Sequence, residues 1–111
     1  MIGYCYSMVM GTSFNNVPTG PINTVAPVIS GGSSLGNTLS STTGTWTGLG
    51  TITYSYQWNR NGNPIRNQTN STYEIVIADS AASITCTVTA TDNAGSNSAL
   101  SNFIIIDIIE E

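Results

Sequence analysis

The feature that most constrains the fold of this chain is the run T-Y-S-Y-Q-W-N-R, which extends from Thr53 to Arg60. With a period of two, it places Tyr54, Tyr56 and Trp58 on one face and small or polar side chains on the other. This alternation is typical of a β-strand that buries one face, so we expect the three aromatic rings to point inward. Asn61-Gly62 follows directly and tolerates the positive φ angles of a tight hairpin turn.

A second alternating run supplies a partner face for the first, and we interpret the two runs as the core pair of a β-sandwich. Its inward side chains would be Ile84, Cys86, Val88 and Ala90. Shorter apolar runs between turn residues predict the other strands, and no stretch has a helical period. These strands are expected at Val28-Ile29, from Leu39 to Trp46 with a bulge at Gly44, at Pro64-Ile65, from Tyr73 to Ile77 with Tyr73, Ile75 and Ile77 inward, and from about Ser98 after a hairpin loop at 92–95.

A chain of 111 residues fits one domain with a hydrophobic core of its own. We divide it into an N-terminal arm and linker at residues 1–25, a sandwich at 26–102, and an apolar C-terminal strand or tail at 103–111. The fold class we expect is all-β. The expected core consists of Leu39, Trp46, Tyr56, Trp58, Tyr73, Ile84, Cys86 and Val88.

Both ends carry large apolar side chains for which the sandwich has no obvious room. The C-terminal segment is apolar on both of its faces, and such a strand needs cover on both sides. We therefore expect the two ends to pair or pack with neighbouring subunits or a particle protein, and the sandwich to fold without residues 103–111. The alternative is that the N-terminal arm folds back over the last strand of its own domain. The side chains expected to bind partners are Tyr4, Tyr6, Phe14, Phe103, Ile104, Ile105 and Ile106.

Charge excludes one class of partner. The net charge is −4, and the only bases are Arg60 and Arg66. A nucleic-acid binder needs several cationic contacts to phosphates, which two arginines cannot supply.

No run approaches the roughly 20 apolar residues that a membrane-spanning helix needs. The N-terminus lacks the basic region of a secretory signal.

The chain has little material for catalysis or metal binding. It has no histidine, and its acidic residues are spread along the sequence without a spacing that makes a carboxylate pair or a cation cage. Asp92-Asn93 could touch a calcium ion, but a hairpin turn explains this pair better. Cys86 lies on an inward face, where a thiol is an inert small hydrophobe. We expect no enzymatic activity, no cofactor and no metal.

Four segments resemble bacterial-type immunoglobulin-like domains, which occur in bacterial surface proteins and in virion proteins of tailed bacteriophages. They are G-T-W-T-G at 44–48, Y-S-Y-Q-W-N-R-N-G at 54–62, S-T-Y-E-I at 71–75 and A-D-S-A-A-S-I-T-C-T-V-T-A-T-D-N-A-G-S at 78–96. The resemblance covers roughly residues 26–102. It implies an immunoglobulin-like sandwich of about seven strands, with Trp58 as the inter-sheet tryptophan and Cys86 on the sixth strand, strand F.

The sequence departs from that family at three positions. Ser41 stands where the partner cysteine of Cys86 would be, so no inter-sheet disulfide is expected. Ile84 stands in place of the corner tyrosine, and Ala81 in place of a frequent glycine. We expect the corner to be held by another device, such as Asp79 capping backbone N–H groups.

The resemblance and the apolar ends together suggest a structural component of a phage virion. Because the chain has its own Met1 and continues for only nine residues past Asn102, we expect a lone module that docks on a large particle. A capsid decoration protein, present in many copies with its loops outward and its ends toward the particle, is the first hypothesis. The alternatives are a tail or head-fibre component, and a carbohydrate-binding or adhesive module of a bacterial cell surface. Weak glycan contact and self-association through the arms are further expectations.

Overall fold

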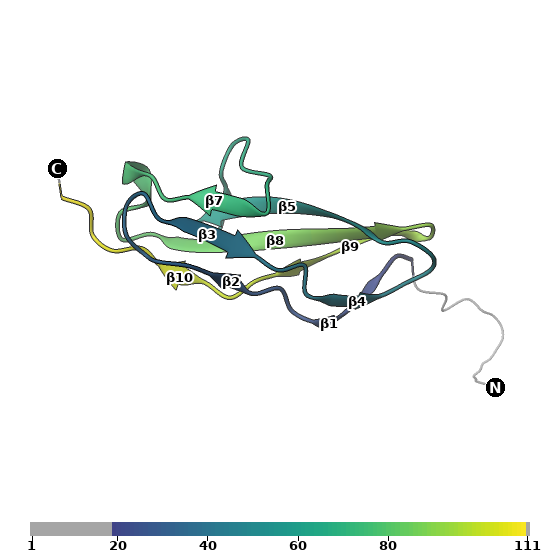
Figure 1. The fold of residues 1–111 in the computed structure, drawn as a ribbon. Coiled ribbons are helices and arrows are strands. Elements are labelled where there is room, and N and C mark those ends of the chain that lie inside the picture. Colours follow the sequence, from purple (N-terminus) through teal and green to yellow (C-terminus); the bar gives the residue numbers. More distant parts are fainter. Residues whose placement is uncertain (1–18, 111) are drawn as a thin grey trace, which may run out of the picture.

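The computed structural model describes residues 19–110, and this part of the chain is all-β apart from one turn of 3₁₀ helix (Figure 1). The expected arm residues Tyr4, Tyr6 and Phe14 lie outside the described residues. The strands are β1 (Ile22–Val25), β2 (Ile29–Ser30), β3 (Thr38–Ser41), β4 (Thr45–Thr47), β5 (Thr53–Arg60), β6 (Asn63–Pro64), β7 (Thr72–Glu74), β8 (Ser83–Asp92), β9 (Gly95–Leu100) and β10 (Ile104–Ile105), and the 3₁₀ helix η1 spans Ile77–Asp79.

The strands form two larger sheets and one small sheet. One larger sheet has the order β10-β8-β5-β6, with β9 also pairing with β8, and the other has the order β2-β3-β7. Strands β1 and β4 form the small sheet. A single buried cluster contains side chains from both larger sheets, so the two sheets pack face to face as in a β-sandwich (Figure 1).

The predicted core pair of strands is confirmed. Strands β5 and β8 pair along their length, with Trp58 opposite Cys86 and Tyr56 opposite Val88. The turn after β5 has positive φ angles at Asn61 (50°) and Gly62 (84°), which are the angles that an Asn-Gly hairpin turn requires. The alternation of residue types therefore predicted the two strands, and the Asn-Gly pair predicted the turn that leads from β5 into β6.

The predicted core lies between the sheets. Trp58 stacks on Tyr73 of the opposite sheet, with ring centroids 5.6 Å apart and planes 25° from parallel. Its indole N–H donates a hydrogen bond to the carbonyl oxygen of Asn70 at 2.7 Å, so the polar atom of this buried ring is satisfied. Tyr56 is only partly buried, whereas seven expected core residues are buried: Leu39, Trp46, Trp58, Tyr73, Ile84, Cys86 and Val88.

Gly44 allows Leu39 and Trp46 both to be buried although their positions differ in parity. It has a φ of 74°, and a Cβ atom at this position would lie 2.4 Å from the carbonyl oxygen of Val25. Only glycine fits such a close approach in this backbone conformation. The chain leaves β3 here and pairs as β4 with β1, whose register shifts between Asn23 and Val25.

Two residues of the expected inward faces are exposed. Tyr54 is 39% exposed because β5, with eight residues, extends beyond the facing strands β3 and β7, which have four and three. Ile77 is 52% exposed because the strand ends at Glu74 and Ile77 begins η1. Parity along a strand predicts burial only where the opposite sheet covers that strand.

The sandwich includes parts of the chain that we assigned to the arm and the tail. Strand β1 pairs Ile22 with Thr47, so sheet formation begins before residue 26. Strand β10 pairs Ile104 with Ile84, and Ile106 is only 1% exposed within the core of its own domain. Residues 104–106 are therefore part of the sandwich, and deletion of 103–111 would take Ile106 out of the core; whether the sandwich folds without this segment stays a prediction.

The described chain begins and ends at opposite ends of the sandwich (Figure 1). At one end, the carbonyl oxygen of Thr19 accepts a hydrogen bond from the side chain of Asn97, which follows the β8–β9 hairpin. At the other end, the N–H of Ile109 donates to the hydroxyl of Ser80, directly after η1. The described part of the chain therefore enters the sandwich at one end and leaves it at the other.

Candidate interaction surfaces

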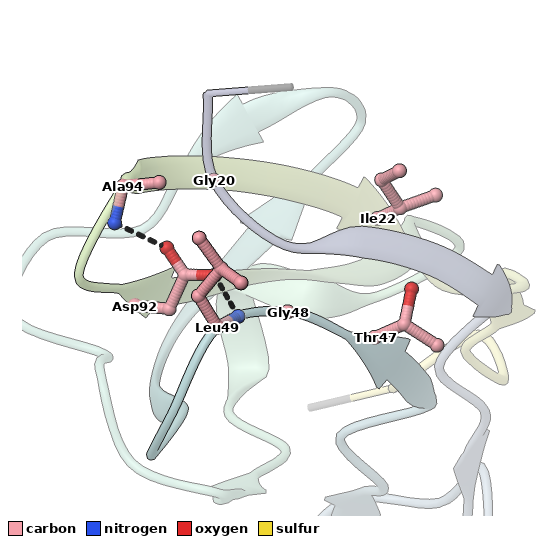
Figure 2. A pocket seen from close by; sticks show the side chains of 7 residues that line it. All are labelled: Gly20, Ile22, Thr47, Gly48, Leu49, Asp92 and Ala94. Carbon is pink, nitrogen blue, oxygen red and sulfur yellow. Dashed lines mark hydrogen bonds between the residues drawn. The ribbon is translucent and has the colours of Figure 1, made fainter. Parts of the chain in front are cut away.

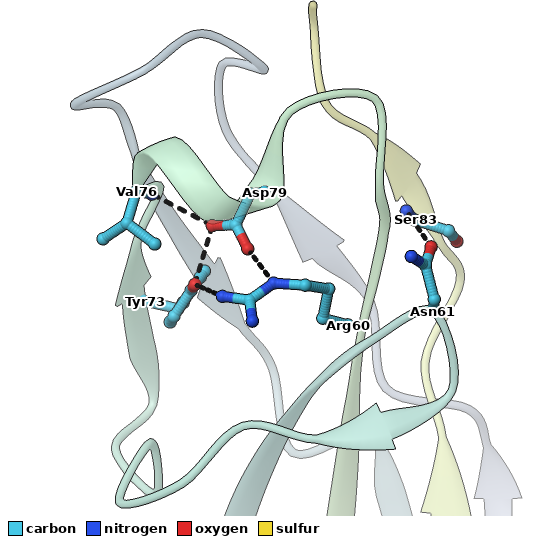
Figure 3. Close-up of polar contacts among 6 residues, drawn as sticks. All are labelled: Arg60, Asn61, Tyr73, Val76, Asp79 and Ser83. Carbon is cyan, nitrogen blue, oxygen red and sulfur yellow. Dashed lines mark hydrogen bonds and ion pairs between the residues drawn. The ribbon is translucent and has the colours of Figure 1, made fainter. Parts of the chain in front are cut away.

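A buried polar cluster fixes the corner that contains η1 (Figure 3). The carboxylate of Asp79 accepts hydrogen bonds from Arg60 Nε at 2.6 Å, from the Tyr73 hydroxyl at 2.7 Å and from the backbone N–H of Val76 at 3.0 Å. Asp79 is fully buried, and the Arg60 side chain is 29% exposed. The expectation that Asp79 caps a backbone N–H group at this corner is confirmed, and the ion pair with Arg60 adds to it.

The cluster shifts the ionisation of its members. The hydrogen bond to Asp79 raises the pKa of Arg60 above its ordinary value. Burial, and then the hydrogen bond to Asp79, raises the pKa of Tyr73 to about 12. Arg60 and Tyr73 therefore both keep their protons over the whole physiological range. Their hydrogen bonds to Asp79 persist over that range and support η1.

We expect the free energy of unfolding to fall as pH rises through the alkaline range. The pKa of Tyr73 is about 12 in the folded chain against an ordinary 10.0, so the unfolded chain releases this proton first. The stabilisation is complete below pH 10 and is lost as pH rises to about 12, with an upper limit of about 2–3 kcal/mol. Urea unfolding at neutral pH and at steps from pH 10 to 12 measures the effect.

The variant Tyr73→Phe is the control for this alkaline loss. Burial also raises the pKa of the Cys86 thiol, and this second group destabilises the fold in the same direction. The difference between the wild-type and Tyr73→Phe curves isolates the contribution of Tyr73. A variant that loses stability with the same pH dependence as the wild type would show that Tyr73 does not titrate as described.

The corner presents an apolar surface that we call the distal tip, formed by Leu35, Val76 and Ile77. These three line an open hollow of about 540 Å³ together with Gly36, Glu74, Ile75 and Ala78. Leu35, Val76 and Ile77 are large apolar side chains that are each about half exposed. A concentration of such side chains on one end of a small domain is a feature of interaction sites.

The C-terminal segment is held next to the residues that flank the distal tip by polar contacts. The backbone N–H of Asp107 donates to Ser33 O at 2.9 Å, and its carboxylate accepts from the hydroxyls of Ser33 and Ser34 at 3.0 and 2.9 Å. The N–H of Ile109 donates to Ser80 Oγ at 2.8 Å. Ile108 lies between these two fixed residues and is 75% exposed.

A smaller hollow of about 300 Å³ lies at the opposite end (Figure 2). Its carboxylate, Asp92, accepts hydrogen bonds from the backbone N–H groups of Leu49 (2.8 Å), Ala94 (2.7 Å) and Gly95 (3.2 Å). These bonds lower the pKa of Asp92, and the bond from Leu49 contributes most. They confirm that Asp92 belongs to a hairpin turn. The hollow is lined by Gly20, Ile22, Thr47, Gly48, Leu49, Asp92 and Ala94.

The predicted partner-binding residues of the C-terminal segment separate into two groups. Phe103 and Ile105 are exposed, at 64% and 54%, and remain available to a partner. Ile104 is partly buried against the core and Ile106 is buried, because alternate side chains of β10 and its continuation face the opposite sheet. Ile106 is therefore a core residue, which corrects its assignment to a partner-binding arm.

The sequence interpretation missed the distal tip. Leu35 stands among serines and glycines that are typical of turns, and neither it nor Val76 is among the residues expected to bind partners. The signal that could have revealed the tip is the run of three apolar residues from Ile75 to Ile77 just before Asp79. Such a run breaks the alternation and indicates that the strand ends.

Within residues 19–110, no group of histidine, cysteine or acidic side chains is arranged to hold a metal ion. The same part of the chain contains no helix that is long and apolar enough to cross a membrane. Cys86 is a fully buried free thiol. No protein-family model, curated protein or solved structure matches the chain.

Proposed function

We propose that this chain is a non-enzymatic docking module with an immunoglobulin-like fold that decorates a virion, most specifically a phage capsid. The observation that carries the proposal is the distal tip, where a buried ion pair supports exposed apolar side chains. The resemblance to virion modules in the sequence supplies the kind of particle.

The arrangement of strands supports the immunoglobulin-like part of this proposal. Strands β1 and β2 follow each other along one direction, as do β3 and β4, and β9 and β10 both pair with β8. Counting each of these pairs as one interrupted strand gives seven strands, in sheets of three and four. Ser41 lowers the pKa of the Cys86 thiol, against the rise caused by burial, and stands at the position where the family has the partner cysteine of an inter-sheet disulfide.

The energetics of the distal tip favour docking on a large partner. Complete burial of a large apolar side chain is worth about 1.5–3 kcal/mol. Three side chains that are each about half exposed would gain roughly 2–4 kcal/mol, before the costs of association are subtracted. The tip alone therefore gives weak binding, and a particle must offer additional contact around it.

Particle incorporation tests this proposal directly. Particles from the virus or cell that encodes the chain are purified, and the chain is quantified in them by mass spectrometry and by antibodies to the folded domain. We expect stoichiometric incorporation and labelling of intact particles. The variant Ile77→Lys is expected to reduce incorporation at least about tenfold, because docking would bury its ammonium group without a partner.

The matched control is Leu49→Lys, which places the same charge on an exposed leucine at the opposite end of the sandwich. It is expected to be incorporated like the wild type. Equal incorporation of both variants would show that the distal tip is not the docking surface. Absence of the wild-type chain from purified particles would refute the virion role as a whole.

A further inference from the structure

The smaller hollow, of about 300 Å³, offers an apolar surface at the end of the sandwich opposite the distal tip (Figure 2). Its largest apolar side chains are Ile22 of β1 and Leu49, just after β4, which are 49% and 61% exposed. Gly20 and Gly48 also line it and leave space where other residues would place a side chain. An exposed concavity with walls of this kind favours an apolar occupant.

The carboxylate at the hollow needs no cation from an occupant. Among the described lining residues, Asp92 alone carries a charge, and three backbone N–H groups already donate hydrogen bonds to it. Gly48 lets the backbone come close to this carboxylate, because a Cβ atom at this position would lie 2.5 Å from Asp92 Oδ2. An uncharged ring can therefore enter beside Asp92 without leaving a charge unpaired.

The segment of residues 1–18 joins the sandwich at the wall of this hollow. Gly20, which lines the hollow, has a φ of 105°, and a Cβ atom there would lie 2.8 Å from the backbone nitrogen of Ser96. The carbonyl oxygen of Thr19 accepts a hydrogen bond from the side chain of Asn97 at 3.2 Å. The point of attachment is therefore fixed beside the hollow. A segment tethered next to a site has an effective concentration of about millimolar there, an advantage that a separate molecule lacks.

The sequence F-N-N-V-P at 14–18 predicts that the chain turns back toward its point of attachment. A residue before proline is extended, so Val17 would lie roughly 7 Å from Thr19. Asn15-Asn16 favours a turn, and a β-turn from Phe14 to Val17 would bring their Cα atoms to within about 7 Å. Phe14 is thereby returned to the neighbourhood of the hollow.

The size of the hollow suits a single aromatic ring. Benzene fills an engineered protein cavity of about 150 Å³. A hollow of about 300 Å³ that is open on one side therefore accepts a phenyl ring and the chain that carries it.

From the apolar walls and the place where the chain enters, we infer that the side chain of Phe14 docks in the smaller hollow of its own domain, against Ile22 and Leu49. The docked segment then covers the end of the sandwich beside the β8–β9 hairpin. This inference reassigns Phe14 from a partner-binding arm to an intramolecular contact. It is independent of the proposed virion role, because the distal tip lies at the other end.

Methyl NMR spectra of the full-length chain test the position of the ring. An aromatic ring shifts the resonances of methyl groups that it contacts, so Phe14→Leu is expected to move the methyl resonances of Ile22 and Leu49. The methyl resonances of Leu35 and Ile77, at the distal tip, are expected to stay in place. The matched control Tyr6→Leu removes another aromatic ring from the same segment and is expected to move none of these resonances. Unchanged Ile22 and Leu49 resonances in Phe14→Leu, or equal changes in both variants, would overturn the inference.

A double-mutant cycle tests the contact by stability. Phe14→Ala is expected to lower the midpoint of urea unfolding by about 0.5–1 M, because docking stabilises only the folded chain. In a Leu49→Ala background, which keeps the backbone N–H that binds Asp92, the same change is expected to lower it by less than about half as much. In a Leu35→Ala background the full shift is expected. An absent shift, or equal shifts in all backgrounds, would overturn the inference.

The dependence on protein concentration identifies the copy that supplies Phe14. A contact within one chain gives the same urea midpoint and the same methyl resonances at all protein concentrations. A midpoint that rises with concentration in the wild type, but not in Phe14→Ala, would assign the hollow to Phe14 of a second copy and overturn the inference.

Discussion

Replacement of Trp58 by alanine is expected to lower the free energy of unfolding by about 3–5 kcal/mol. The side chain is fully buried, stacks on Tyr73 across the two sheets, and donates its N–H to Asn70 O. Its removal leaves both a cavity and an unpaired carbonyl group. Since domains of this size have a total stability of about 5–15 kcal/mol, the variant is close to unfolding. Urea unfolding followed by circular dichroism measures the change.

Tyr54→Ala is the matched control, because it removes an aromatic ring of the same parity from the same strand. Tyr54 is substantially exposed, so we expect a loss of no more than about 1 kcal/mol. Similar losses in the two variants would contradict the account in which the facing sheet covers Trp58 and leaves Tyr54 open.

Replacement of Asp79 by alanine is expected to lower the free energy of unfolding by about 3 kcal/mol. Loss of the carboxylate removes the partner of Arg60 Nε, the Tyr73 hydroxyl and the Val76 N–H. Breaking a buried ion pair typically costs about 3–5 kcal/mol, and the partial exposure of Arg60 places this variant at the lower end of that range. Chemical denaturation at neutral pH measures the loss.

Asp107→Ala is the control for Asp79→Ala, since the carboxylate of Asp107 accepts only from two exposed serine hydroxyls. Its expected effect is about 1 kcal/mol or less. A loss as large as that of Asp79→Ala would mean that removing any acid destabilises this chain, irrespective of burial. If Asp79→Ala were neutral instead, the buried cluster would not support η1.

The central strands could be predicted from sequence because burial of one face imposes an alternation that is visible locally. The pairing of Trp58 with Cys86 follows from two such runs. The same rule failed for Tyr54 and Ile77, since their burial depends on where the opposite sheet ends and where η1 begins. Neither limit is encoded within the strand itself.

The limits of the domain depend on contacts between residues distant in sequence. So does the buried cluster of Arg60, Tyr73 and Asp79 beneath the distal tip. Ile22 pairs with Thr47, and Ile104 with Ile84, so no local pattern marked these segments as parts of the sandwich. One signal for the buried cluster was present. Arg60 has the same parity as Trp58, which places a charge on the inward face and requires a partner such as Asp79.

The position of the two described ends at opposite poles of the sandwich determines how the module would respond to tension. A pull between the two ends of the described chain runs nearly parallel to the strands (Figure 1). The hydrogen bonds of an antiparallel pair are perpendicular to its strands, so such a pull loads them together in shear rather than opening them one after another. At the C-terminal end of this path, the load first reaches the two-residue strand β10, with support from the contacts of Asp107 and Ile109. Mechanical yielding would begin there, while the long β5–β8 pair still holds the core.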